Sequence, residues 1–110
     1  MKSEIKDNHV LIQDEKDDIC GFATFLTKIY EQFSNQNMIV DLLKYDEATL
    51  QDLLCYLELS NLHRSHKRSF VMVNNSLRND EIPDELLVVP TLQEAEDVIQ
   101  MEEIERDLGF

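Results

Sequence analysis

The sequence has few glycines and no long hydrophobic run. With only two Gly among 110 residues, a glycine-rich loop that cradles a phosphate through its backbone amides is excluded. No run of about 18 apolar residues occurs, so no segment is predicted to span a membrane. The opening MKSEIKDNHVLIQDE also lacks the apolar stretch of a signal peptide. We therefore expect a cytoplasmic protein without a membrane anchor.

Basic residues are also scarce. Lys and Arg number 10 against 23 Asp and Glu, which gives a formal net charge of -13. Such a surface repels phosphate backbones, so we expect no direct nucleic-acid binding and a partner that is a basic protein. The hydrophobic fraction of 43% nevertheless predicts a folded core, and the length fits one domain, 1–110. Either a monomer or a homodimer is compatible with the sequence.

The two cysteines, Cys20 and Cys55, lie in unrelated contexts without a CxxC or a metal-type spacing. Neither has a neighbouring His that would activate it, and no serine lies in a nucleophile elbow. We therefore interpret both cysteines as buried, reduced side chains and predict no disulfide. The same absences predict that the protein is not an enzyme and uses no cofactor and no metal.

Hydrophobic patterning predicts alternating strands and helices. The expected strands are Glu4–Lys6, Val10–Gln13, Met38–Leu43, Ser69–Val73 and Leu86–Val89. The expected helices run from Asp17 or Asp18 to near Asn35, from Thr49 to about Ser65, and over 91–108, with at most one helical turn within 74–85. Because strand-helix-strand units cross over right-handed and place their strands parallel, the fold class is α/β. We expect a mixed sheet of about five strands, a hairpin supplying edge strands, helices mainly on one face, and the order β-β-α-β-α-β-(short α)-β-α.

Local signals mark the ends of two helices. Thr49 with Asp52, and Thr91 with Glu94, each form a capping-box pattern at a helix start. Gly109 is placed to cap the end of the last helix.

Several features occur in an order that resembles the STAS domain family, typified by the anti-sigma-factor antagonists of bacteria. After an opening hairpin and an amphipathic helix, a central strand ends in Val40-Asp41-Leu42, a later apolar strand ends at Asn74, and the last helix opens with Thr-Leu-Gln-Glu-Ala at 91–95. The likeness covers nearly the whole chain and rests on architecture and a few positions. It implies a STAS-like sheet and a non-enzymatic, regulatory role in protein–protein interaction, with a sigma-factor regulator as the partner.

In that family, the loop after the central strand carries Asp-Ser-Ser-Gly or Asp-Ser/Thr-x-Gly, and a partner kinase phosphorylates its hydroxyl. Aligned on Asp41, this motif falls on 49–52, where Thr-Leu-Gln-Asp departs from it at every position. Thr49 is the one candidate for phosphorylation in the loop, but an N-cap role suits it better. The resemblance therefore implies a constitutive contact surface over 45–53, formed by Asp46, Glu47, Thr49, Gln51 and Asp52.

The end of the chain also resembles a second group, the short acidic proteins of Bacteroidetes-type bacteria that are labelled ribonuclease Z. The metal-binding His-x-His-x-Asp-His signature of that enzyme is absent, and 110 residues are too few for its fold. The likeness implies at most an acidic accessory or regulator of such a nuclease. In this alternative the carboxylates of helix 91–108 replace phosphates, with Ile104, Leu108 and Phe110 as apolar anchors. The sequence leaves open whether this helix docks on its own domain or on a partner.

Three other polar groups have simpler explanations than a site. The basic cluster in HRSHKR complements the negative end of a helix dipole, although it could also contact a phosphate, an acidic partner or the protein's own carboxylates; its members are His63, Arg64, His66, Lys67 and Arg68. The acidic group before the first helix lacks the Gly and final Glu of a calcium loop, so we interpret it as helix-start electrostatics; it comprises Asp14, Glu15, Asp17 and Asp18. Asp41 is expected to be a structural, hydrogen-bonded carboxylate.

Overall fold

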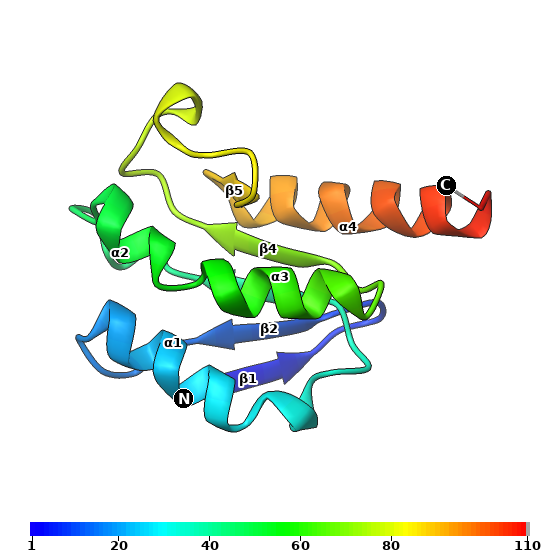
Figure 1. Cartoon of the computed structure of the whole chain (residues 1–110), viewed down its shortest axis with the longest axis horizontal. Helices are drawn as coiled ribbons and strands as arrows, with labels where there is room; N and C mark the ends of the chain where they lie inside the picture. The colour runs from blue at the N-terminus through cyan, green and yellow to red at the C-terminus, as the bar shows by residue number, and fades with distance from the viewer. Residues whose placement is uncertain (110) are drawn as a thin grey trace.

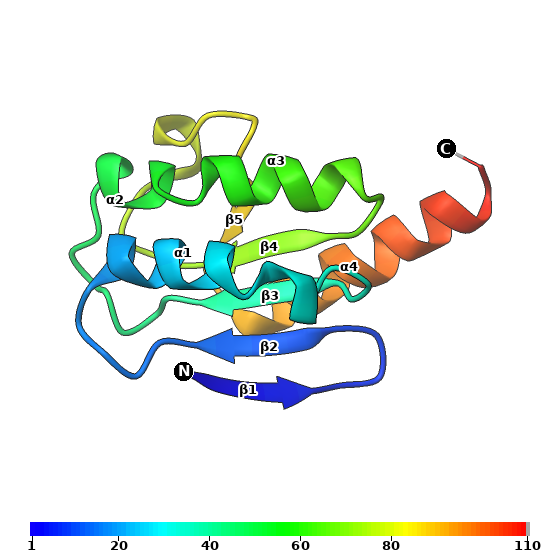
Figure 2. The same ribbon diagram turned by 60° about the horizontal axis from the view of Figure 1, so that its bottom comes forward.

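The computed structural model describes residues 1–109, within which five strands form one mixed sheet with helices on both faces (Figures 1 and 2). The strands are β1 (Lys2–Ile5), β2 (Val10–Gln13), β3 (Met38–Asp41), β4 (Phe70–Val73) and β5 (Val88–Val89). They lie in sequential order, with β1 antiparallel to β2 and all later neighbours parallel. The expected α/β class with a five-stranded mixed sheet is confirmed.

The helical elements are α1 (Ile19–Lys28), α2 (Leu50–Leu54), α3 (Leu57–Ser65) and α4 (Leu92–Asp107), with short 3-10 helices η1 (Tyr30–Gln32) and η2 (Asn79–Glu81). Figure 2 shows α1, α2 and α3 on one face of the sheet and α4 on the other. The expectation that helices lie mainly on one face therefore holds for the first three, and α4 forms a separate layer.

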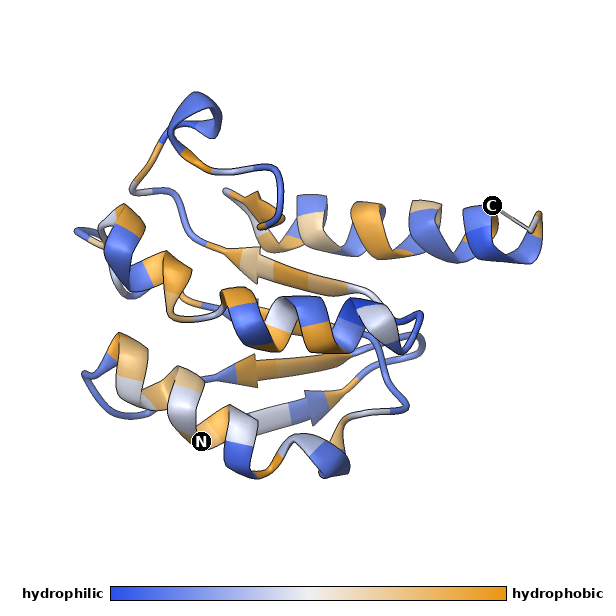
Figure 3. Ribbon diagram, in the orientation of Figure 1, coloured by the Kyte–Doolittle hydropathy of each residue, from blue (hydrophilic) through white to orange (hydrophobic). Residues whose placement is uncertain are grey.

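The strands bury both of their faces because their side chains alternate between the two helical layers. In β3, Met38 and Val40 join the core under α1–α3, whereas Ile39 joins the core under α4. The parallel register pairs Ile39 with Val71 of β4, which lies in the same α4-side core. The hydrophobic colouring of the central strands in Figure 3 follows from this double burial.

The segment expected as one helix from Thr49 to about Ser65 is divided in two. Between α2 and α3 the α-helical hydrogen-bond pattern is interrupted at Cys55 and Tyr56, whose amides donate to the carbonyl oxygens three residues earlier. The break directs Tyr56 into the core, where it is fully buried and its hydroxyl donates to the carbonyl oxygen of Ile19 at 2.7 Å. A continuous helix is therefore the wrong prediction, because a tertiary contact outweighs local helical preference here.

The first helix is also shorter than expected, since α1 ends at Lys28 and not near Asn35. After Ile29 the chain tightens into η1, which turns Tyr30 and Phe33 into the core. Its start agrees with the sequence, because the Asp18 side chain accepts from the Gly21 amide at 2.9 Å and caps the helix.

Among the helices of residues 1–109, none is both long enough and apolar enough to cross a membrane.

Candidate functional site

The carboxyl ends of the parallel strands β2, β3 and β4 meet at one edge of the sheet, beside α2 and the start of α1 (Figure 1). Ligands and partners of parallel sheets bind preferentially outside this edge, because the connecting loops gather there. The loops that leave these strands begin at Asp14, Leu42 and Asn74. We call the exposed part of the loop and helix start at 45–53 the contact edge.

Two side chains at the end of β4 fasten the loop that carries the contact edge. The amide nitrogen of buried Asn74 donates to the carbonyl oxygens of Leu42 and Tyr45, both at 2.9 Å. The Ser76 hydroxyl lies 2.8 Å from the Ala48 carbonyl oxygen. The backbone of residues 42–48 is thus held against the sheet at three carbonyl groups, which restricts its conformation.

Tyr45 ties the same loop to the loop after β2. Its hydroxyl donates to the Asp14 carboxylate and lies 3.0 Å from the carbonyl oxygen of Lys16. Burial, followed by the hydrogen bond to Asp14, raises the pKa of Tyr45 above its usual value, so the phenol remains a donor to this carboxylate well above neutral pH. The Lys44 ammonium also contacts the Lys16 carbonyl oxygen.

Asp41 has the structural role expected from the sequence. One of its oxygens accepts from the Gln13 side chain at 2.7 Å, and the other accepts from the Leu43 backbone amide at 3.0 Å. These bonds join the ends of β2 and β3 and start the turn into the contact loop. The carboxylate therefore positions the backbone of this turn.

The predicted contact residues fall into two groups. Asp46, Glu47 and Gln51 are exposed, and within residues 1–109 their side chains form no hydrogen bond or ion pair. Thr49 and Asp52 form the capping box of α2: the Thr49 hydroxyl accepts from the Asp52 amide at 3.2 Å, and the Asp52 carboxylate accepts from the Thr49 amide at 3.0 Å. The N-cap interpretation of Thr49 is confirmed, so the first three residues are those free to meet a partner.

The contact edge is hollowed and acidic. An open hollow of about 220 Å³ is lined by the residues of 44–48 and by Asp52. The neighbouring loop adds further acidic side chains, the exposed Glu15, Asp17 and Asp18. Lys44 pairs with Asp17 at 3.5 Å, but Asp17 is 99% exposed, so solvent weakens this pair. The net charge of the edge favours a basic surface over a phosphate or an acidic one.

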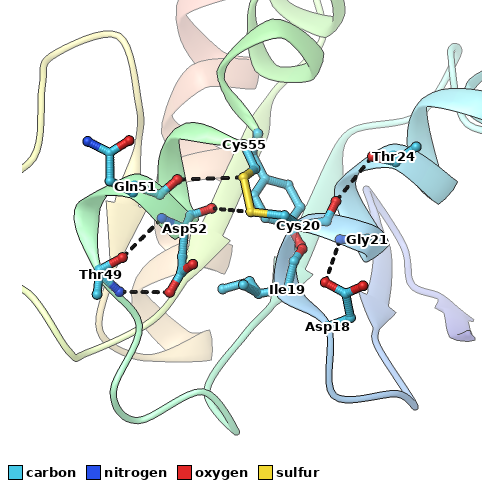
Figure 4. Close-up of a disulfide and its surroundings, with 10 residues drawn as sticks. Asp18, Ile19, Cys20, Gly21, Thr24, Thr49, Gln51, Asp52 and Cys55 are labelled. Atoms are coloured by element: carbon cyan, nitrogen blue, oxygen red, sulfur yellow. Dashed lines mark hydrogen bonds between the residues drawn. A yellow bond between two sulfur atoms is a disulfide. The ribbon is translucent and has the colours of Figure 1, made fainter.

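The prediction for the cysteines is wrong, because Cys20 and Cys55 form a disulfide that joins α1 to the end of α2 (Figure 4). Their Cα atoms are 5.5 Å apart, a normal separation for a disulfide. Cys20 is only half-buried and Cys55 is exposed. The break after α2 brings Cys55 to the start of α1, a non-local effect that the sequence spacing does not reveal.

His63 and His66, the two histidines of the basic cluster, share a hydrogen-bond network with Tyr30. The His63 ring nitrogen Nε2 donates to the Gln36 carbonyl oxygen at 2.6 Å, so in the neutral ring Nδ1 accepts from the Tyr30 hydroxyl at 2.7 Å. The Tyr30 oxygen in turn lies 2.9 Å from Nδ1 of His66. Burial lowers the pKa of fully buried His63 to about 4.

The basic cluster is consequently not one surface patch. His63 lies in the core, whereas Arg64 pairs with Glu102 of α4 at 3.4 Å and donates to the Phe70 carbonyl oxygen at 3.2 Å. This arrangement supports pairing with the protein's own carboxylates for Arg64. No group of three or more metal-ligating side chains occurs in the described range 1–109, which includes the acidic residues before α1.

The last helix docks on its own domain through one face. Ala95 and Ile99 are fully buried against the sheet. Further along, Glu102 accepts from the Ser69 hydroxyl at 2.5 Å, and Arg106 donates to Ser69 at 3.2 Å. The opposite face carries Ile104 and Leu108, two of the predicted anchors, and both are exposed. The third, Phe110, lies outside the described residues.

No known protein-family model matches the chain, and no curated protein sequence matches it.

Proposed function

We propose that this protein is a non-enzymatic, STAS-like interaction module that binds a basic partner protein constitutively through the contact edge. One observation carries the proposal: the exposed side chains of Asp46 and Glu47 project from a loop whose backbone is held by hydrogen bonds at residues 42, 45 and 48, and exposed Gln51 follows in the first turn of α2. The order of hairpin, helix, central strand with Asp41, capped helix and a late strand followed directly by Asn74 supports the STAS-like assignment.

Preorganisation is the physical reason for favouring this loop. Asn74, Ser76 and Tyr45 already hold its backbone, so a partner does not have to supply the free energy of ordering it. Carboxylates without partners in the free protein also gain the most from a basic side chain brought by another protein.

Phosphorylation is not part of the proposal. The Thr49 hydroxyl accepts from the Asp52 amide in the first turn of α2, and a phosphate at this position would place up to two further negative charges beside Asp52. A sigma-factor regulator remains the kind of partner that the resemblance suggests, bound without the usual phosphate-controlled release.

Affinity capture with matched variants tests the contact edge. The triple variant D46A/E47A/Q51A removes its three exposed side chains. The control D84A/E85A/Q100A removes the same residue types from exposed positions elsewhere. We expect the wild type and the control to capture the same partner, identified by mass spectrometry, and the edge variant to lose it. Equal capture by the edge variant would reject this surface.

An acidic accessory of a nucleic-acid-processing enzyme such as ribonuclease Z is the second proposal. It is favoured by the carboxylates of α4 that point away from the sheet, among them Glu96, Asp97 and Glu105, all exposed. Deleting the end of the helix is a poor test, because Glu102 and Arg106 bind Ser69 on the domain. The variant E96Q/D97N/E105Q keeps those contacts, and loss of nuclease inhibition or binding in this variant alone would support the second proposal.

A further inference from the structure

The face of α4 that points away from the sheet carries an apolar stripe. Met101, Ile104 and Leu108 are 62%, 54% and 68% exposed. They are spaced by three and four residues, so they share one side of the helix, opposite Ile99 and Arg106, which face the domain. The remaining large exposed hydrophobic side chains of residues 1–109 are scattered over other elements: Met1, Ile5, Phe25 and Leu62.

The stripe belongs to a helix that is already folded and docked on the domain. Its inner face is anchored by Ala95 and Ile99 in the core and by Arg106, which donates to Ser69 and Asn37 at 3.2 Å. Figures 1 and 2 show the carboxyl half of α4 extending past the strands of the sheet. A partner can therefore reach this side of the helix without moving the domain, at little cost in ordering.

Acidic side chains border the stripe. Asp97 precedes Met101 by one turn and Glu105 follows it by one turn, and both are exposed. The whole of α4 carries seven carboxylates and one Arg. A second copy of this helix would bring like charges together along its full length, which disfavours self-association. A basic amphipathic segment would instead gain apolar contact with the stripe and ion pairs with the carboxylates beside it.

We propose that the stripe of Met101, Ile104 and Leu108 is a docking surface for a basic amphipathic helix of a partner protein. The partner helix lays an apolar row on the stripe, in the manner of helix-on-helix packing. Its Lys or Arg side chains, placed beside that row, pair with Asp97 and Glu105. This surface lies on the α4 layer and is independent of the contact edge.

The test uses a synthetic helical peptide of Leu and Lys, with leucines at helical spacing on one side, labelled for fluorescence anisotropy. We expect it to bind the oxidised full chain, and M101S/I104S/L108S to weaken binding roughly tenfold or more, because the apolar contact is lost. The control I5S/F25S/L62S exchanges three exposed hydrophobic side chains elsewhere and should bind as the wild type does. Circular dichroism verifies that each variant is folded.

Further variants and controls distinguish a basic helix from net charge alone and from a second copy of the chain. D97N/E105Q should weaken binding and flatten its dependence on salt. The contact-edge variant D46A/E47A/Q51A should bind the peptide like the wild type, so failure of either surface is seen separately. If a scrambled peptide of the same composition binds equally well, net charge alone explains the binding, and the proposal is overturned. Self-association in sedimentation that M101S/I104S/L108S abolishes would assign the stripe to a second copy and overturn it as well.

Discussion

The two faces of the sheet are covered in different ways. The face under α1–α3 buries a large core that includes Phe22, Leu26 and Tyr56, and the disulfide between Cys20 and Cys55 joins its helices covalently. The face under α4 buries a smaller core around Ile39 and Ile99, and beyond Ile99 the helix is held by polar contacts. The same strands thus support one strongly fixed layer and one lightly fixed layer.

Each layer carries one of the two proposed contact surfaces, so these surfaces differ in how firmly they are held. The contact edge belongs to the strongly fixed layer, because α2 packs into that core through Leu53 and Asn74 holds the loop before α2. A rigid loop presents its exposed polar side chains to a partner in one fixed geometry. The lightly fixed α4 offers a long helical side with an apolar stripe, which suits recognition by packing.

The largest expected effect is loss of the disulfide from the strongly fixed face. Cys20 and Cys55 are 35 residues apart in sequence, so the variant C20S/C55S should lose roughly 4 kcal/mol of the free energy of unfolding through greater freedom of the unfolded chain. Urea denaturation of the oxidised protein and the variant measures the difference. A reductant should lower the stability of the wild type by a similar amount and leave the variant unchanged. Equal stability of the oxidised protein and the variant would contradict a stabilising role of the disulfide.

Removal of one buried side chain from each face sharpens the comparison. Leu26 and Ile99 are both fully buried. Leu26→Ala or Ile99→Ala should each lower the free energy of unfolding of the part of the molecule that the residue holds by about 2–4 kcal/mol. Hydrogen exchange should then distinguish them, since I99A should speed exchange mainly in α4, whereas L26A should speed it throughout the molecule. Global acceleration by I99A would mean that α4 is as strongly coupled as α1.

Acid should weaken the strongly fixed face through His63. Its pKa is about 4 in the folded protein, and the unfolded ring takes up a proton near 6.5, so the unfolded state binds more protons between these values. Stability therefore falls as the pH is lowered through this window, by at most about 3 kcal/mol from this group. Histidine NMR titration gives the direct measurement, and a folded-state pKa for His63 near 6.5 would contradict its burial.

The smallest effect is expected at the polar end of α4. Arg106→Met removes donors to Ser69 and Asn37 and should cost about 1.5 kcal/mol, because these are hydrogen bonds to a charged group. Arg78→Met is the matched control, since Arg78 is 80% exposed and should change stability little. Thermal unfolding of both variants compares them, and a larger loss in R78M would refute this role of Arg106.

Local features of the fold were predictable from the sequence. Strand Val10–Gln13 has the predicted bounds, and Thr49 and Thr91 cap their helices as expected. Gly109 also ends α4 as predicted, with a positive φ of 85°. These signals depend on residues within one or two turns of each other, so neighbouring side chains are enough to define them.

Non-local contacts were not predictable in this way. The disulfide joins residues on either side of the contact in which the Tyr56 hydroxyl donates to Ile19, 37 residues away, and the helix break at Tyr56 accompanies that contact. Tyr30 and His63 meet across a similar distance. Asp46 and Glu47 were proposed as contact residues from the STAS resemblance, but the hydrogen bonds from Asn74 that fix their loop become visible only in the folded chain.

Native-state hydrogen exchange of the oxidised protein tests most directly whether the two layers differ and whether the contact edge is preformed. We predict slow exchange at the amides of Tyr45 and Leu53, which donate to the carbonyl oxygens of Leu42 and Thr49, and earlier opening of α4 beyond Ile99 than of β3. Exchange of Tyr45 and Leu53 at the rate of an unstructured peptide, or protection of the end of α4 equal to that of β3, would contradict the account.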